Sequence, residues 1–151
     1  MELKRVANCI LIDQDQVLLI KKPSRGWYSI PGGKMEKGET IKEAVMREYW
    51  EETALHLESP TLAGVFTFTV GSEEWMMFTF TSQANNGTLT TYCEEGELEW
   101  VPLADLVKLP MAEGDHKIFE HILTRQGLVI GAFSYSEAYT LLDFRIERSG
   151  S

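Results

Sequence analysis

The sequence predicts a single domain of mixed α and β structure. Short runs rich in β-branched and aromatic residues recur along the chain, as in strands, and two other segments carry apolar residues at helical spacing. The chain has 151 residues, which is the size of one ordinary domain. It contains no repeat, linker or low-complexity segment, so we treat residues 1–151 as one domain.

The first third of the chain contains a predicted hairpin, a loop and a helix. Residues 6–12 and 17–20 are apolar runs, and the polar residues 13–16 between them favour a turn. Residues 21–31 predict a loop, and three glycines keep the following stretch irregular. Thr40 and Glu43 have the spacing of a capping box, so a helix is expected to begin there and to end near residue 52.

The remaining elements follow from the same rules. We expect strands at 62–70, 74–82 and 97–101, a turn at 85–87, a helical turn at 102–109, a helix at 116–125 and a strand pair at 128–146. The aromatic alternation of the last segment suits packing on the chain's own core and suits a homodimer contact equally well.

Charge and composition exclude several classes of function. The 23 acidic and 14 basic residues give a formal net charge of −9, which would repel a nucleic-acid polymer. No apolar run is long enough to cross a membrane, and the first residues lack the pattern of a secretory signal. Cys9 and Cys93 fit no metal-binding spacing and are expected to pack as small apolar residues in a reducing cytosol. We therefore expect a cytoplasmic protein that binds neither membranes nor nucleic acid.

Three glutamates on one face of the predicted helix indicate a cation site. Glu48, Glu51 and Glu52 lie at i, i+3 and i+4, where like charges destabilise an isolated helix. Arg47 adjoins them, and the glycines of residues 31–33 allow backbone carbonyls to approach an ion. Oxygen ligands of this kind suit Mg²⁺ or Mn²⁺, which would let an acidic protein hold a phosphate chain. The alternative is a solvated acidic helix face.

The residues around this cluster resemble the Nudix box, Gly-x5-Glu-x7-Arg-Glu-U-x-Glu-Glu-x-Gly-U, in which U is apolar. Gly33, Glu39 and Arg47 match at the required spacing, as do the three glutamates, and the box extends from residue 33 to 55. Tyr49 is a mild departure at an apolar position. Ala54 replaces the final glycine, and because alanine in a left-handed conformation costs ~1–2 kcal/mol, we expect the chain to leave the helix differently.

The resemblance implies a fold and roles for particular residues. The fold is an α/β/α sandwich around a mixed sheet. The metal ligands would be Glu48, Glu51, Glu52 and a carbonyl of Gly32 or Gly33, and they would hold more than one Mg²⁺ or Mn²⁺ ion. Glu48 or Glu52 would orient the attacking water. Arg47 belongs to the same catalytic unit and, with Glu39, would position the loop and helix. We add Glu95 as a candidate distal ligand, with an acidic solvated turn as the alternative.

The resemblance also implies the reaction. We expect metal-dependent hydrolysis of a nucleoside triphosphate to the monophosphate and pyrophosphate, as in the MutT-type subgroup that acts on oxidised guanine nucleotides such as 8-oxo-dGTP. Candidate contacts to the base are Asn8, Asp115 and an aromatic ring, Trp27 or Tyr28; candidate contacts to phosphate are Arg25 and Lys34. Each has a structural alternative: a satisfied core amide for Asn8, a helix N-cap for Asp115, loop packing for the rings and solvation for the cations.

Two other functions are compatible with these residues. The substrate could be another nucleotide polyphosphate, namely a guanosine alarmone, a dinucleoside polyphosphate or a nucleotide sugar. The chain could also be a nucleotide-binding regulatory module without turnover, although such proteins commonly lose box carboxylates and this sequence keeps them.

Overall fold

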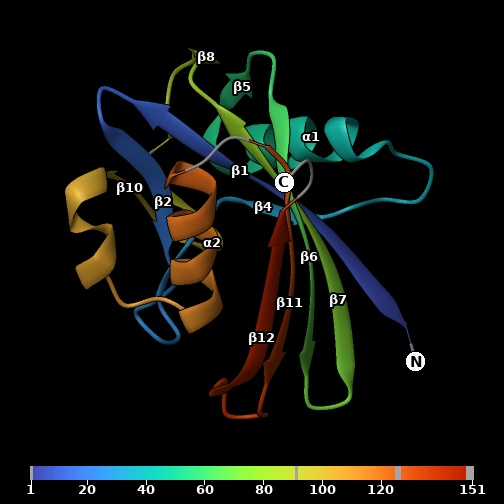
Figure 1. Ribbon diagram of the computed structural model, residues 1–151. Helices are drawn as coiled ribbons and strands as arrows, with labels where there is room; N and C mark the ends of the chain where they lie inside the picture. The colour runs from blue at the N-terminus through green and yellow to red at the C-terminus, as the bar shows by residue number, and fades with distance from the viewer. Residues whose placement is uncertain (1, 91, 125–126, 149–151) are drawn as a thin grey trace.

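A computed structural model describes residues 2–90, 92–124 and 127–148. A mixed sheet lies at the centre, with helix α1 (Ile41–Thr53) on one face and helix α2 (Glu113–Thr124) on the other (Figure 1). The expected sandwich of mixed α and β structure is therefore confirmed. None of the described helices is long and apolar enough to cross a membrane.

Within the described residues the main sheet has ten strands, in the order β12-β11-β6-β7-β1-β2-β10-β9, with β3 paired to β2 and β4 paired to β1. Their bounds are β1 Leu3–Asp13, β2 Gln16–Lys21, β3 Tyr28–Ser29, β4 Gly32–Lys34, β6 Thr61–Val70, β7 Glu73–Ser82, β9 Tyr92–Cys93, β10 Gly96–Pro102, β11 Val129–Tyr135 and β12 Leu141–Arg148. The pairs β1–β7 and β6–β11 are parallel. A small second sheet pairs β5 (Leu55–Leu57) with β8 (Asn85–Gly87).

Strand β1 is the centre of both cores because its side chains alternate between the two faces. Ala7, Cys9 and Leu11 pack with α1, whereas Ile10 packs in the core that contains α2. Cys9 is fully buried, as expected for a small apolar residue. The strand thus fixes the distance between the two helices, and β4 is hydrogen-bonded along its edge.

Helix α1 begins as predicted and ends in an unexpected way. The Thr40 hydroxyl accepts from the Glu43 N–H, and the Glu43 carboxylate accepts from the Thr40 N–H, which confirms the capping box. At the other end Ala54 has φ 64° and ψ 21°, so it does adopt the left-handed conformation. The expectation that the chain would leave differently is wrong. The Ala54 N–H donates to the Trp50 carbonyl, and this cap keeps the usual path despite the side chain.

Several predicted boundaries need correction. Residues 85–87 form strand β8 instead of an isolated turn, because they pair with β5. Helix α2 begins at Glu113, three residues before the predicted start, and the predicted loop contains the short strand β3. The helical turn is a 3₁₀ helix (Leu103–Lys108). The predicted hairpin β1–β2, the long strands and the final pair are confirmed, and the final pair packs on the chain's own β6.

Candidate active site

Strand β4 brings two glycines against β1 and the glutamate face of α1. Gly32 pairs with Asn8 and Gly33 pairs with Ala7. A Cβ on Gly33 would overlap the Glu48 carboxylate, and a Cβ on Gly32 would overlap the backbone of β1. The backbone contact requires glycine at position 32, whereas a side chain at position 33 would require the Glu48 carboxylate to move. The Gly33 backbone thus lies directly beside a carboxylate.

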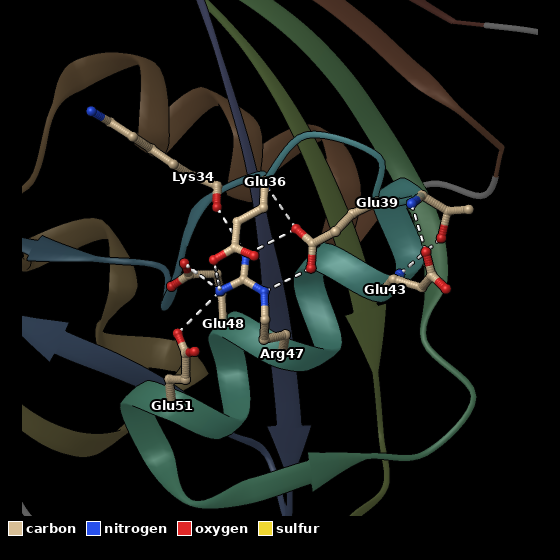
Figure 2. A network of polar contacts seen from close by, with 8 residues as sticks. Lys34, Glu36, Glu39, Glu43, Arg47, Glu48 and Glu51 are labelled. Atoms are coloured by element: carbon tan, nitrogen blue, oxygen red, sulfur yellow. Dashed lines mark hydrogen bonds and ion pairs between the residues drawn. The ribbon is translucent and has the colours of Figure 1, made fainter.

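Arg47 organises the acidic face of α1 (Figure 2). Its guanidinium binds Glu39 through two hydrogen bonds of 2.7 and 2.9 Å, and donates to the Lys34 carbonyl at 3.1 Å. The Nη1 atom lies 3.0 Å from Glu48 and 3.1 Å from Glu51. A single side chain therefore ties the loop after β4 to the helix and holds two of the three candidate ligands.

These ion pairs set the protonation of the cluster. Arg47 lowers the pKa of the Glu39 carboxyl to about 2, and Glu39 in turn raises the pKa of Arg47. Burial raises the pKa of Glu48, although Arg47 opposes that effect. Glu39 is thus a permanently charged anchor, whereas Glu48 is a desolvated carboxylate that benefits from a nearby cation.

Glu52 is the most buried of the three clustered glutamates of α1, and Arg47 forms ion pairs with the other two. The Glu52 side chain is only 8% exposed and accepts a 2.6 Å hydrogen bond from the Gly32 N–H. Burial raises its pKa to about 7, with smaller contributions from the charges of Glu95 and Glu48. A buried carboxylate that faces other carboxylates is suited to a cation or to a proton.

The three glutamates open into one hollow of about 930 Å³. Glu95, Lys22 and Lys34 also line it, and Lys22 lies 3.0 Å from Glu95 in an ion pair. Among the described residues, no three His, Cys, Asp or Glu side chains are grouped closely enough to hold one ion, since Arg47 draws Glu48 and Glu51 to itself. The donor set is nevertheless all oxygen, which suits Mg²⁺ or Mn²⁺. Glu52 is buried, Glu48 is partly buried and Glu51 is exposed, and the set borders a glycine backbone.

A second cavity of about 380 Å³ lies between β1, β7, β11 and the start of α2. Its walls are largely aromatic or apolar, and include Phe68, Trp75, Met77, Phe133 and Tyr135. Polar side chains also line it, namely Asn8, Lys22, Ser29 and Asp115. An apolar cavity with a few convergent polar groups is the usual form of a small-molecule site.

The polar groups of this cavity have unused hydrogen-bonding capacity. Asn8 is 8% exposed, and its Nδ2 lies 3.2 Å from the Met77 sulfur. Among the described residues, neither the Asn8 Oδ1 nor the Ser29 hydroxyl has a hydrogen-bond partner. Burial raises the pKa of Asp115 to about 7, so this carboxyl is partly protonated at neutral pH. Such groups could accept and donate hydrogen bonds to a ligand in the cavity.

The two hollows adjoin. Both are lined by Val6, Lys22, Gly32, Gly33 and Trp75. An aromatic cavity with hydrogen-bonding groups therefore leads past the glycine bend into a carboxylate-lined hollow. With cations on the carboxylates, this arrangement would suit a ligand with an aromatic end and an anionic end.

Other predicted contact residues lie elsewhere. Arg25 and Trp27 line neither hollow; both pack on Tyr139, which lines the aromatic cavity. The Tyr28 hydroxyl donates to Glu99 and its ring is buried. Asp115 lies inside the first turn of α2, so the helix N-cap alternative is wrong because the helix starts earlier.

Sequence reasoning missed several residues that line the hollows. Lys22, Ser29, Trp75 and Tyr135 come from four different strands or adjoining loops, and no local motif marks them. Lys22 had one available signal, the pair of basic residues Lys21 and Lys22 directly after the predicted strand at 17–20.

Comparison with known proteins identifies the family. The NUDIX domain model matches residues 2–122. The chain belongs to the Nudix family. It is 45% identical over 150 residues to the uncharacterized Nudix hydrolase YvcI of Bacillus subtilis, covering 96% of this chain and 95% of that protein. It is thus a Nudix hydrolase of the group that cleaves phosphoric anhydride bonds of nucleotides.

Two further relatives extend over nearly the whole chain. The crystal structure of a MutT protein from Bacillus halodurans superposes with a TM-score of 0.93 at 45% identity, covering 95% of this chain and 97% of that one. The oxidized purine nucleoside triphosphate hydrolase of Mus musculus is 28% identical over 163 residues and covers 100% of this chain and 99% of that protein. The Nudix chain described here therefore shares its C-terminal hairpin region with these relatives.

Proposed function

We propose that this Nudix hydrolase cleaves a purine nucleoside triphosphate, with oxidised guanine nucleotides such as 8-oxo-dGTP preferred, to the monophosphate and pyrophosphate. The observation that carries the proposal is the junction of the two hollows at Lys22, the glycine bend and Trp75. A base would occupy the aromatic cavity, and the phosphate chain would extend over the carboxylates. The mouse relative, named for oxidised purine nucleoside triphosphates, supports this choice of substrate.

The carboxylate hollow would provide the chemistry. Glu48, Glu51, Glu52 and the Gly33 carbonyl would hold divalent cations, with Glu95 as a further ligand if it leaves Lys22. When bound, Mg²⁺ supplies electrostatic stabilisation of the charge that develops on the phosphoryl oxygens. Glu48 or Glu52 would orient the attacking water and accept its proton. A bond forms between the water oxygen and one phosphorus of the chain while the anhydride bond to that phosphorus breaks, which gives the monophosphate and pyrophosphate.

The aromatic cavity would read the base. Guanine oxidised at C8 carries an N–H at N7, where guanine has only an acceptor. The unpartnered Asn8 Oδ1 is a buried acceptor that could receive such a donor, and Asp115 can act as donor or acceptor near neutral pH. Sites built on buried hydrogen bonds discriminate strongly between ligands that do and do not complete them.

A substrate panel tests the proposal. Values of kcat/KM with Mg²⁺ should be highest for oxidised guanine nucleotides when these are compared with dGTP, 8-oxo-dGDP, ADP-ribose, a guanosine alarmone and a dinucleoside polyphosphate. Product analysis in ¹⁸O-labelled water identifies the phosphorus that is attacked. A preference for any of the last three compounds would replace the proposed substrate class with another nucleotide polyphosphate.

A variant tests whether the chain turns substrate over at this site. Glu52→Gln removes the charge of the buried carboxylate and should reduce kcat by at least about 10²-fold, as the loss of a general base does. Glu58→Gln, an exposed position outside both hollows, is the matched control. Wild-type binding of nucleotides without hydrolysis would instead indicate a regulatory module.

A further inference from the structure

The C-terminal hairpin β11–β12 lies beyond the residues that the family model matches, yet it forms one wall of the aromatic cavity. The match ends at residue 122, whereas β11 begins at Val129. Phe133 and Tyr135 of β11 line the cavity, and so does Tyr139 in the turn that follows. The hairpin lies next to β6 at one side of the sheet, below α2 in Figure 1. This segment therefore contributes to the cavity separately from the Nudix box.

Tyr135 connects the hairpin to the helix that carries Asp115. Its buried hydroxyl accepts a 2.7 Å hydrogen bond from the Gly114 N–H, one of the first-turn donors that a helix cannot satisfy internally. A Cβ on Gly114 would overlap that hydroxyl, so the contact requires glycine. Asp115 follows directly. The phenol thereby fixes the position of the first turn of α2 relative to the cavity.

Tyr139 connects the hairpin to the loop between β2 and β3. The Arg25 guanidinium lies 4.6 Å from the centre of the Tyr139 ring and 5.0 Å from that of Trp27. Trp27 meets the Tyr139 ring edge-on, with centroids 6.3 Å apart. Tyr139 has φ 63°, an unfavourable backbone conformation for a tyrosine, and its N–H donates to the Ser136 carbonyl at 2.9 Å. The ring is thus held at the rim by contacts from a segment more than a hundred residues away.

We propose that the hairpin β11–β12 is the base-selecting element of this hydrolase. Tyr139 closes the rim of the base cavity through its contacts with the Arg25 guanidinium and the Trp27 ring, and Tyr135 acts as a positioning residue that aligns Asp115 with the base edge. The inference rests on the proposed function, because it takes the aromatic cavity as the base site. The hairpin would select the base together with Asn8 and Asp115, whereas the phosphate chemistry would take place at the Nudix box. Changes in the hairpin should therefore alter KM and base preference and leave kcat nearly constant.

The experiment compares four hairpin variants in two assays. Tyr139→Leu removes the ring and Tyr139→Phe restores it; Tyr135→Phe removes the acceptor of the Gly114 N–H. Leu142→Ala, an exposed position on β12 outside the cavity, is the matched control. The first assay is calorimetric binding of 8-oxo-dGMP and dGMP without divalent ions. The second is steady-state hydrolysis of the corresponding triphosphates, with thermal unfolding to confirm that each variant is folded.

The expected results distinguish base selection from a structural role. Tyr139→Leu should weaken binding of both monophosphates about tenfold, the size of one lost aromatic contact, and Tyr139→Phe should restore it. Tyr135→Phe should reduce the preference for the oxidised base about tenfold with kcat within about twofold of wild type, because one aligned hydrogen bond is worth about that factor. Leu142→Ala should change neither quantity.

Other results would overturn the inference. Unchanged monophosphate binding in Tyr139→Leu would show that Tyr139 is not part of the base site. A loss of kcat in Tyr139→Leu without a change in KM would show the same. Equal binding by wild type of a purine and of ribose 5-phosphate would show that the cavity holds no base. If wild type bound 8-oxo-dGMP but hydrolysed no triphosphate, the proposed function would fail while the binding results would still decide the role of the hairpin. If Tyr135→Phe did not fold, the comparison of Tyr139→Leu with Tyr139→Phe would by itself test the role of the hairpin.

Discussion

Ala54 shows how a single residue can depart from a motif without changing the path of the chain. It has φ 64° at the position where the Nudix box has glycine, and its N–H still caps α1 through the Trp50 carbonyl. The side chain therefore retains a conformational cost of ~1–2 kcal/mol that glycine would not have. The cost lies at the C-terminal end of the helix, two residues after Glu52, and does not disturb the glutamate face.

Replacing Ala54 by glycine should stabilise the protein. The relief of left-handed strain exceeds the ~0.5–1 kcal/mol by which glycine favours the unfolded chain, so the net gain should be about 0.5–1 kcal/mol. In a domain of this size Tm should rise by about 1–4 °C. Ala44→Gly, on the buried face of α1 near its start, is the control and should lower Tm. A decrease in Tm for both variants would contradict the assignment of strain to Ala54.

Asp115 gives the protein a pH-dependent stability. Burial raises its folded pKa to about 7, whereas the unfolded value is near 3.9. The favourable contribution of the protonated form is therefore complete below about pH 4 and is lost as the pH rises through about 7. Asp115→Asn stays neutral at every pH, so its Tm advantage over wild type should grow by at least about 2–4 °C between pH 4 and pH 8.

The measurement is thermal unfolding of both proteins across that range. Asp143→Asn, an exposed position on β12, is the control and should show no growing difference. A Tm difference between Asp115→Asn and wild type that stays constant with pH would show that the Asp115 carboxyl titrates normally.

At the scale of elements, Arg47 joins the loop after β4 to α1. Its planar guanidinium binds Glu39, Glu48, Glu51 and the Lys34 carbonyl together, which a lysine ammonium cannot do. Arg47→Lys should therefore displace the loop relative to the helix and lower kcat/KM about 10²-fold, the effect of a misplacement near 1 Å. The Tm of Arg47→Lys should fall. Mg²⁺ should recover part of that loss because its charge offsets the repulsion among the glutamates.

Activity and Tm with and without Mg²⁺ measure this effect. Arg145→Lys, an exposed position on β12, provides the matched control and should behave as wild type. Unaltered kcat/KM in Arg47→Lys would mean that the loop and helix are positioned by other contacts.

Elements that depend on interactions between residues close together in the sequence were predictable. The capping box at Thr40 and the glutamate spacing on α1 depend on residues three or four apart, so the helix and its acidic face followed directly. Strand β8 was missed because its partner is β5, some thirty residues earlier, and nothing in residues 85–87 themselves favours a strand. Asn8 and Asp115 were predicted as single residues, but their shared cavity depends on how β1 and α2 meet across the sheet.

At the scale of the whole molecule, the net charge of −9 makes phosphate binding depend on cations. Under the proposed function, a base in the aromatic cavity would need no ion, whereas the carboxylate hollow would repel a phosphate chain. Without divalent ions, affinity should therefore fall from nucleoside to monophosphate to a non-hydrolysable triphosphate analogue, and Mg²⁺ should reverse the order. Calorimetric Kd values for the three ligands, with Mg²⁺ and with a chelator, measure this. Tighter binding of the triphosphate in the chelator would contradict the expected role of charge.

The central claim is that the glutamates of α1 jointly hold a divalent ion beside the glycine bend. Calorimetric titration of Mn²⁺ into wild type, Glu48→Gln, Glu52→Gln and the control Glu58→Gln tests it most directly. The account predicts saturable binding by wild type and Glu58→Gln, and at least about tenfold weaker binding by each of the other two, since each loses one charged ligand. Equal Mn²⁺ binding by all four proteins, or saturable binding by none, would contradict it.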